Sequence, residues 1–390
     1  MRILFLTFYF EPDLCAGSFR NTSLFKELLN QLTPKDFVHV VTTHPNRYKT
    51  FQAEGASLEE AENFRINRIR IPRHKSGFTD QAISFRVFYK EALKITKTEK
   101  YDLVYASSSR LFTAFLGRRI ASARKIPLYL DIRDIFVDTM NDIFQDKPYI
   151  RIPLTLILKR IENYTFSKAT HINLVSEGFR EYFKKYTHPF YSFFTNGIDD
   201  VFLNLSQTIS SNTHTQKIIT YAGNIGSGQG LEKIIPQAAR QLGKEYRFRI
   251  IGDGGKKEVL KTALQTYGLE NVEMLNPLSR DELIRYYRES DYLFLHLNDL
   301  EAFKKVLPSK LFEYAVFGKP IIAGVSGYAR EFILQNLPES IVFRPTDAED
   351  LVLQLKSYST SSPDHEKFIE TYARKNIMHA MAKSIRALSK

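Results

Sequence analysis

The residues best placed to do chemistry lie between 306 and 325, where the sequence reads VLPSKLFEYAVFGKPIIAGV. Pro308, Ser309 and Lys310 open a short apolar helix that carries one acid, Glu313. A helix start offers free backbone N–H groups and the positive end of the helix dipole, which suits a phosphate. Glu313 follows Ser309 by about one helical turn, so its carboxylate can accept hydrogen bonds from hydroxyl groups just beyond that phosphate. A phosphate cradle beside a hydroxyl acceptor is typical of a nucleotide-sugar site.

Two glycine-rich turns in the same half of the chain extend this candidate site. Residues 221–230 read YAGNIGSGQG and residues 249–255 read RIIGDGG, each after an expected strand. Glycine lets the backbone approach an anion closely, but the spacing does not fit a dinucleotide-binding fingerprint. Each turn alone is equally consistent with a plain tight turn, whereas turns at neighbouring strand ends converge on one crevice. The expected donor-binding residues are Gly223, Asn224, Gly226, Gly252, Gly254, Pro308, Ser309, Lys310 and Glu313.

A second group of candidate residues lies in the first half of the chain. The segment LYLDIRD (128–134) is a buried strand that ends in Asp131, Arg133 and Asp134, where α/β sheets place their ligands. Together with Lys310 these are the expected catalytic residues, and the alternative is a structural ion pair at the strand end. The expected acceptor-binding residues are Gly17 and Ser18, at the start of the first long helix, and His44, after the second strand. Ser18 as a helix N-cap and His44 as a structural histidine are the alternatives.

Strand and helix signals alternate along the chain, which predicts parallel sheets covered by helices. Strands are expected at 3–8, 37–42, 69–71, 103–106, 128–130 and 171–175, and then at 218–222, 248–251, 272–274, 292–295, 321–323 and 341–343. Helices are expected at 18–32, 85–97 and 152–168, and then at 231–242, 256–267, 280–289, 309–317, 329–335, 348–358 and 372–388.

This order predicts an α/β protein of two Rossmann-like domains of similar size. The expected domains are residues 1–200 and 201–371. Residues 372–390 form a final helix with no strand left to follow, so we expect it to pack back on the first domain. The polar stretch Ser206–Lys217 is the expected linker.

The composition narrows the class of protein. With 43% hydrophobic and 25% charged residues in 390, the chain is an ordinary globular one. Its one cysteine excludes an internal disulfide framework and fits a reducing compartment, and the apolar start reads as a buried strand rather than a signal peptide. We therefore expect a cytoplasmic protein. No histidine or carboxylate spacing suits a metal ion, so no metal and no cofactor are expected.

The net charge of +12 is concentrated in the first half, which carries 30 basic and 20 acidic residues up to Thr195. A basic half indicates an anionic partner, although a solvated surface is an equal alternative. No nucleic-acid motif accompanies the charge, so nucleic acid is not expected. Arg86, Lys90, Lys94 and Lys97 form a basic stripe on the 85–97 helix, which predicts peripheral binding to an anionic membrane surface. A surface helix packed by its apolar face is the alternative.

Taken together, these segments resemble the retaining glycosyltransferases of family 4, which have the GT-B fold. The resemblance covers nearly the whole chain: EPDLCAGSFR, LKRIENYTFSKATHINLVSEGF, TNGID, YAGNIG, RIIGDGG, SDYLFLHL and PSKLFEYAVFGKPIIA follow in family order. It is greatest with bacterial enzymes that build O-antigen, capsule and exopolysaccharide units. The resemblance implies transfer of a hexosyl or N-acetylhexosaminyl group, with retention, from a nucleotide-diphosphate sugar to a saccharide or lipid-linked saccharide. It also implies that the two domains face each other across a cleft, with residues 1–200 as the acceptor-binding domain and 201–371 as the donor-binding domain. A UDP-sugar is the favoured co-substrate.

The chain also departs from the family pattern. The family has a second glutamate eight positions before the one matched by Glu313, where this chain has Lys305, and Glu301 is out of register. The family's two phosphate-binding cations align with Asn224 and Gln229, which leaves Lys310 as the expected cation of the cradle. Two alternatives therefore stay open. One is a GT-B nucleotide-sugar epimerase or hydrolase, and the other is a non-catalytic subunit that binds a sugar nucleotide.

Overall fold

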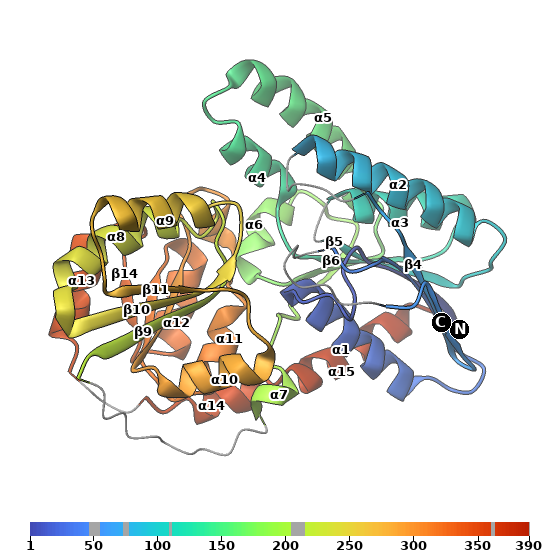
Figure 1. Ribbon diagram of the computed structural model, residues 1–390. Coiled ribbons are helices and arrows are strands. Elements are labelled where there is room, and N and C mark those ends of the chain that lie inside the picture. Colours follow the sequence, from blue (N-terminus) through green and yellow to red (C-terminus); the bar gives the residue numbers. More distant parts are fainter. Residues whose placement is uncertain (47–54, 73–77, 109–110, 204–214, 360–362, 390) are drawn as a thin grey trace. The chain divides into compact units, whose positions relative to one another are not determined.

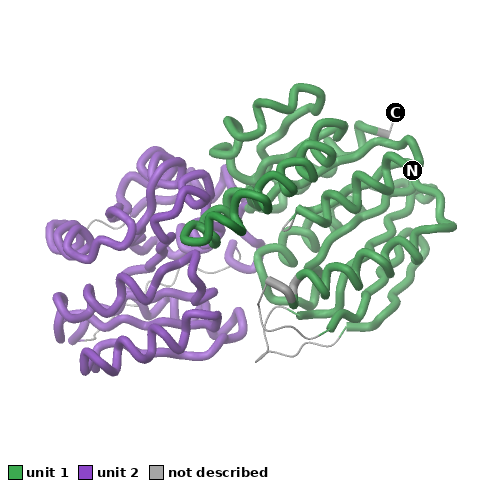
Figure 2. The backbone as a smooth tube through the Cα atoms, turned by 90° about the horizontal axis from the view of Figure 1, so that it is seen from above, with its two compact units in different colours: residues 1–196, 374–390 green, residues 197–373 purple. Residues whose placement is uncertain are grey.

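The chain folds into two compact units, each built around its own sheet. The computed structural model describes residues 1–46, 55–72, 78–108, 111–203, 215–359 and 363–389. Unit 1 comprises Met1–Asn196 and Arg374–Lys390, and unit 2 comprises Gly197–Ala373 (Figure 2). Of the expected linker, residues 206–214 lie outside the described residues. Both units have the mixed α/β architecture that the sequence predicts.

Unit 1 contains an eight-stranded sheet in the order β3-β4-β2-β1-β5-β6-β7-β8. Every neighbouring pair is parallel except β3 with β4. β5 and β6 are buried along their whole length, because helices cover both faces of a parallel sheet. The strands are β1 (Arg2–Leu6), β2 (Phe37–Thr43), β3 (Leu58–Ala61), β4 (Phe64–Ile69), β5 (Leu103–Ser108), β6 (Leu128–Ile132), β7 (His171–Leu174) and β8 (Phe190–Ser192).

The helices of unit 1 include one that is distant in sequence from all the others. The helix α15 lies beside α1 (Figure 1), and its Met378, Met381, Ala382 and Ile385 are buried in the same core as the strands of unit 1. The helices are α1 (Ala16–Gln31), α2 (Phe78–Thr96), α3 (Leu111–Arg124), α4 (Phe136–Ile143), α5 (Pro148–Phe166), α6 (Arg180–Phe183) and α15 (Arg374–Arg386).

The chain passes between the units at two adjacent points. Arg374 donates from Nε to the backbone carbonyl of Asn196 at 2.9 Å. On the unit 2 side, the backbone N–H of Ile198 donates to the carbonyl of Tyr372 at 2.7 Å, and Ile198 forms a parallel bridge with Ala373. The two connections are therefore bonded to each other on both sides of the boundary.

Unit 2 contains a six-stranded parallel sheet in the order β11-β10-β9-β12-β13-β14. Apolar side chains fill both of its faces as two buried clusters. The strands are β9 (Lys217–Asn224), β10 (Tyr246–Asp253), β11 (Val272–Leu275), β12 (Tyr292–His296), β13 (Ile321–Gly324) and β14 (Ile341–Phe343). The helices are α7 (Asp200–Leu203), α8 (Leu231–Leu242), α9 (Lys257–Thr266), α10 (Arg280–Glu289), α11 (Lys310–Ala315), α12 (Gly327–Asn336), α13 (Ala348–Ser357) and α14 (Glu366–Thr371).

Three local expectations need correction. The strand expected at 69–71 lies earlier, as β4 (Phe64–Ile69), because the alternation of apolar and basic residues there begins at Phe64. The helix expected at 309–317 is the six-residue α11. Its dipole is therefore smaller than the longer expected helix would have. The strands β3 and β8 and the helices α3, α4, α6, α7 and α14 were not predicted.

Candidate functional site

The strand order of unit 2 places its candidate site where β9 and β12 lie side by side. The chain winds in opposite directions from these two strands, and the loops after them separate at the carboxyl edge of the sheet. Ligands of open α/β sheets bind at this kind of crossover point. The YAGNIGSGQG turn follows β9, the RIIGDGG turn follows β10, and α11 precedes β13, so all three sequence motifs belong to this edge.

The two glycine turns pack against each other through their backbones. Gly223 and Gly252 are partners in the β9–β10 ladder, and both have positive φ angles, +144° and +148°. A Cβ on Gly252 would overlap the carbonyl of Gly223, and a Cβ on Gly254 would approach the carbonyl of Ile225 at 2.5 Å. Side chains at either glycine would separate the turns, so the sequence needs glycine at both positions.

Lys310 lies directly against the first of these turns. A Cβ on Gly223 would overlap the Cε and Nζ atoms of Lys310. The ammonium nitrogen is 5.2 Å from the centre of the Tyr221 ring, whose face attracts a cation. Tyr221 in turn donates from its hydroxyl to the carbonyl of Asn224 at 2.5 Å. The structure thus brings a positive charge to the glycine turn that the sequence predicted as a phosphate cradle.

Tyr314 fixes the helix α11 to the strand β9, and Glu313 is the neighbouring residue on the same helix. The Tyr314 hydroxyl is fully buried and accepts a hydrogen bond from the backbone N–H of Ala222 at 3.2 Å. Burial raises the pKa of Tyr314 above its usual range, and the Glu313 charge adds to this effect. Glu313 itself is half-buried. Pro308 and Ser309, also half-buried, accept from the backbone N–H groups of the first helical turn at 3.2 Å each.

Asn224 and Gln229 hold the first glycine turn closed. The Asn224 amide donates from Nδ2 to Oε1 of Gln229 at 2.7 Å. A Cβ on Gly226, which lies between them, would approach Nδ2 of Asn224 at 2.5 Å. The two positions that carry cations in the resembled family therefore serve to shape the turn in this chain, which leaves Lys310 as the cation that contacts Gly223.

His296 is a residue of this edge that the sequence reasoning missed. The backbone N–H of Thr346 donates to Nε2 of His296 at 2.9 Å, so Nδ1 carries the proton and donates to the carbonyl of Gln229 at 2.5 Å. Burial lowers the pKa of His296 to about 4. The neutral ring thus ties the end of β12 to the glycine turn and to the loop after β14. Its position as the last residue of a buried strand, in SDYLFLHL, was the available signal.

Glu301 and Lys305 are the two residues near the position of the missing upstream glutamate. Glu301 precedes a short 3₁₀ turn (Phe303–Lys305), and Lys305 is the last residue of that turn. The Glu301 side chain is 73% exposed and forms an ion pair with Lys304. That pair and the hydrogen bond from Lys304 lower the pKa of Glu301. Lys305 is half-buried. Glu301 is thus engaged with its own turn rather than directed toward α11.

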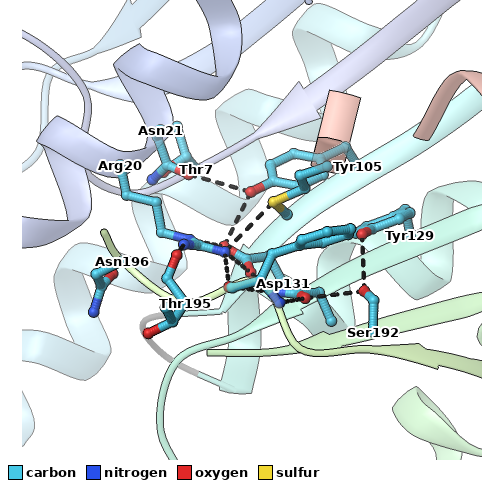
Figure 3. A network of polar contacts seen from close by, with 12 residues as sticks. Thr7, Arg20, Asn21, Tyr105, Tyr129, Asp131, Ser192, Thr195 and Asn196 are labelled. Atoms are coloured by element: carbon cyan, nitrogen blue, oxygen red, sulfur yellow. Dashed lines mark hydrogen bonds and ion pairs between the residues drawn. The ribbon is translucent and has the colours of Figure 1, made fainter. Parts of the chain in front are cut away.

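In unit 1, Asp131 is the centre of a buried polar network (Figure 3). Arg20 donates to its two carboxylate oxygens from Nε at 2.8 Å and from a terminal nitrogen at 2.9 Å, and both side chains are fully buried. Asn173 donates to the same carboxylate at 2.7 Å and Tyr105 at 3.2 Å. Burial alone would raise the pKa of Asp131, but the Arg20 charge and these hydrogen bonds hold it below its usual value.

This network joins segments far apart in the sequence. Arg20 on α1 also donates to the backbone carbonyls of Phe194 at 2.8 Å and Thr195 at 2.6 Å, just before the chain leaves unit 1. Its terminal nitrogen lies 3.4 Å from the sulfur of Met381 on α15. The geometry engages Asp131 in holding Arg20, as the structural alternative for this residue expected.

Arg133 directly follows the carboxyl end of the same strand and lies next to the first helix of unit 1. A Cβ on Gly17 would overlap a terminal nitrogen of Arg133, so these two candidates are brought together. Arg133 Nε is buried and has no hydrogen-bond partner among the described residues. Asp134 is half-buried between β6 and α4. Arg133 therefore brings a positive charge to the carboxyl edge of the unit 1 sheet.

The remaining acceptor candidates lie along the same edge. Ser18 is buried in the first turn of α1, and the N-cap of this helix is Cys15, so Ser18 is not its N-cap as the alternative expected. His44 follows β2 and contacts the Ser57 hydroxyl from Nε2 at 3.0 Å. Burial and the charges of Arg70 and Arg68 lower the pKa of His44.

The structure also bears on metals and membranes. Among the residues it describes, no three His, Cys, Asp or Glu side chains gather where they could hold a metal ion. Within the same parts of the chain, no helix combines the length and the apolar character that crossing a membrane requires. On α2, Phe85 packs on Phe112 at 5.4 Å between ring centres and Phe88 on Phe8 at 5.4 Å, while Ile83 is 55% exposed. The four basic residues of the expected stripe are exposed.

Comparisons with known proteins address the family and the fold. Residues 206–376 match the family model of glycosyl transferases group 1. The putative colanic acid biosynthesis glycosyl transferase WcaI of Escherichia coli (strain K12) is 31% identical over 164 residues, which are 42% of this chain and 40% of WcaI. The match thus spans about two fifths of that relative.

Solved structures extend the likeness to the whole chain. Anabaena Alr3699/HepE in complex with UDP-glucose superposes with a TM-score of 0.64 at 15% identity, over 100% of this chain and 97% of that one. WaaG, a glycosyltransferase involved in lipopolysaccharide biosynthesis, gives 0.60 at 14% identity, over 99% and 95%. At these identities the likeness establishes the fold, which is GT-B. Residues 206–376 are therefore similar to the glycosyl transferases group 1.

Proposed function

We propose that this protein is a retaining glycosyltransferase that moves a hexosyl or N-acetylhexosaminyl group from a nucleotide-diphosphate sugar to an acceptor hydroxyl. The observation that carries the proposal is the contact of Lys310 with Gly223 at the crossover point of the unit 2 sheet. A cation beside a glycine turn suits a diphosphate, since positive charge and close backbone approach act together there. Glu313, on the same helix, would accept hydrogen bonds from the ribose hydroxyls.

In the reaction, the bond between the anomeric carbon and the phosphate oxygen breaks, and a bond from the acceptor oxygen to that carbon forms. The departing diphosphate gains negative charge, which Lys310 and the backbone amides of residues 223–226 would stabilise. We propose that the departing phosphate oxygen takes the acceptor proton, so that no separate base is needed. Lys310 supplies the charge that a divalent ion would otherwise supply, so we expect activity to survive chelation by EDTA.

The donor is proposed to be a UDP-sugar. HepE was crystallised with UDP-glucose and with UDP, and it shares the fold of this chain. The acceptor is proposed to be a saccharide or lipid-linked saccharide that contacts unit 1 near Gly17, Ser18, His44 and Arg133. The likeness to WcaI favours a role in bacterial surface polysaccharide biosynthesis. A cytoplasmic location follows from the single cysteine and remains part of the proposal.

Product analysis tests this function. The protein would be incubated with labelled UDP-sugars and with saccharide or lipid-linked acceptors, and the products separated and their anomeric configuration measured. Transfer with retention supports the proposal. Release of free sugar without transfer indicates a hydrolase, a changed sugar in the nucleotide product indicates an epimerase, and donor binding without any turnover indicates a non-catalytic subunit. A thermal-shift screen of nucleoside diphosphates would identify the base first, because a ligand that binds the native state raises the melting temperature.

A further inference from the structure

One helix of unit 1 exposes several large apolar side chains to solvent. On α5, Tyr149 is 72% exposed, Ile152 58%, Leu156 57% and Ile157 54%. Pro153 between them is exposed as well. These five residues, here called the α5 apolar strip, recur at three- and four-residue intervals and so share one face of the helix. A soluble surface rarely gathers so many large apolar residues without a partner.

The opposite face of α5 accounts for its packing within unit 1. Leu158, Glu162, Thr165 and Phe166 are buried, and the helix contacts α3 and α4. The hydrophobic requirement of the fold is met by this inner face alone. The residues of the α5 apolar strip therefore lie outside the buried core of unit 1.

A basic hollow continues the strip along the same helix. Arg118, Lys159, Arg160 and Lys168 line an open hollow of about 540 Å³, together with Leu156, Asn163, Tyr164 and Ser167. Within the described parts of the chain, none of the four basic side chains lies within 4.0 Å of a carboxylate oxygen. Arg118 lies over the Tyr164 ring, 5.3 Å from its centre. From Lys147 to Ile161 the sequence has four basic residues and no acidic one.

We propose that this face of α5 binds the surface of an anionic phospholipid bilayer. Leu156 belongs both to the α5 apolar strip and to the lining of the basic hollow. The apolar side chains and the basic side chains therefore form one continuous surface. Apolar residues enter the boundary between headgroups and acyl chains, while basic residues attract anionic headgroups. The basic hollow would hold lipid phosphates, and the α5 apolar strip would lie in the bilayer. This moves the membrane contact from α2, whose aromatic side is already packed, to α5.

Vesicle binding with charge-matched variants tests the proposal. Flotation of the full chain with phosphatidylglycerol vesicles is compared with flotation with phosphatidylcholine vesicles, without donor or acceptor. The wild type is expected to bind the anionic vesicles and to lose this binding at high salt. Lys159→Glu/Arg160→Glu is expected to weaken binding by about tenfold or more, because each basic residue near the surface contributes to the attraction. Arg86→Glu/Lys90→Glu, the same charge change on α2, is expected to weaken it much less.

A second pair of variants separates the apolar contribution. Leu156→Glu is expected to weaken binding strongly, whereas Leu353→Glu, at a leucine 65% exposed on α13 of unit 2, is expected to leave it near normal. Circular dichroism checks that all variants fold. Equal losses on α2 and α5, equal binding of both vesicle types, or no binding at all would overturn the proposal. So would a change from dimer to monomer on Leu156→Glu with vesicle binding unchanged, since the face would then bind a second copy of the chain. Because no sugar nucleotide is used, the outcome is independent of the proposed transfer reaction.

Discussion

The side chain of Lys310 occupies the space that a Cβ at Gly223 would need, and its ammonium group lies 5.2 Å from the centre of the Tyr221 ring. The two residues are 87 positions apart in the sequence, yet the β9 ladder and the Tyr314 hydrogen bond to Ala222 fix their relation. The side chain of Lys310, on α11, therefore lies against the glycine turn that follows β9. The predictions about the donor site depend on this contact.

Gly223→Ala should displace Lys310 and so weaken donor binding and turnover, each by about tenfold or more. The added methyl group would overlap Cε and Nζ, and the φ of +144° is unfavourable for alanine. Steady-state kinetics and donor titration provide the measurement. Gly243→Ala is the matched control, since Gly243 also has a positive φ, +58°, but a Cβ there would meet nothing within 4 Å. If both variants behaved alike, backbone strain rather than the lysine contact would be responsible.

Lys310→Ala should lower turnover more than donor affinity, because charge on the diphosphate increases as it departs. Loss of one transition-state donor corresponds to a fall of about a hundredfold in kcat. Kinetics at saturating donor, compared with the donor dissociation constant, separate the two effects. Lys356→Ala, at an exposed lysine of α13, serves as the control. Near-normal turnover in Lys310→Ala would make Lys310 a structural residue and leave Arg133 as the candidate cation.

Glu313→Gln should weaken binding of the nucleotide while the protein stays folded. An amide keeps the shape of the side chain but accepts weaker hydrogen bonds from hydroxyl groups than a carboxylate does, and a charged bond contributes about 1.5–3 kcal/mol. Isothermal titration with the nucleoside diphosphate alone measures this loss. Glu301→Gln, at the exposed acid before α11, is expected to bind normally. Unchanged affinity in Glu313→Gln would place the ribose elsewhere.

Asp131→Asn should destabilise unit 1 rather than abolish chemistry. The change leaves the Arg20 guanidinium buried without its carboxylate partner, which costs about 3–5 kcal/mol in comparable buried pairs. Urea unfolding followed by circular dichroism measures the loss, with Asp146→Asn on the surface as control. Donor affinity should stay normal where the variant is folded, because the candidate donor residues belong to unit 2. Normal stability combined with lost turnover would instead return Asp131 to the reacting centre.

Stability should fall as the pH drops from 6.5 to about 4, in part through His296. Burial lowers its pKa from 6.5 to about 4, so in this window the unfolded chain binds the proton and the native protein does not. The full shift corresponds to about 3 kcal/mol, and His171, whose pKa burial also lowers to about 4, adds to the same slope. Urea unfolding across this range should show a shallower slope for His296→Gln. The exposed His188→Gln is the control, and an unchanged slope in His296→Gln would contradict the assignment.

The regular elements were predictable where one periodicity dominated. The helices α8 and α10 begin and end at the predicted residues, because apolar residues recur at helical spacing between clear boundary signals. The helix α3 was missed although it is well formed, since its buried residues Leu111, Thr113, Ala114 and Gly117 include small and polar types. The short edge strands β3 and β8 carry exposed residues that give no strand pattern.

Contacts between residues far apart in the sequence limited how much of the candidate site could be predicted. The glycine turns and the Pro-Ser-Lys segment are local patterns, so the sequence predicted them as one group. The Arg20–Asp131 pair joins residues 111 positions apart, and only the packing of α1 on β6 shows that the aspartate is occupied. On α5 the apolar residues have core-like spacing, and a sequence does not tell which of two apolar faces will meet solvent. The sequence therefore drew attention to the basic stripe of α2, and the exposed apolar residues of α5 became visible only in the structure.

The position of α15 has a consequence for the order in which the chain folds during synthesis. Residues 197–373 form unit 2 from one continuous stretch of the chain, so all of its residues are available once this stretch has left the ribosome. Unit 1 begins at Met1 but lacks the buried side chains of Met378, Met381 and Ile385 until residues 374–390 emerge. The part translated first is thus the part completed last. Until then its β1–β5 core is exposed on one side, a state in which nascent chains depend on chaperones.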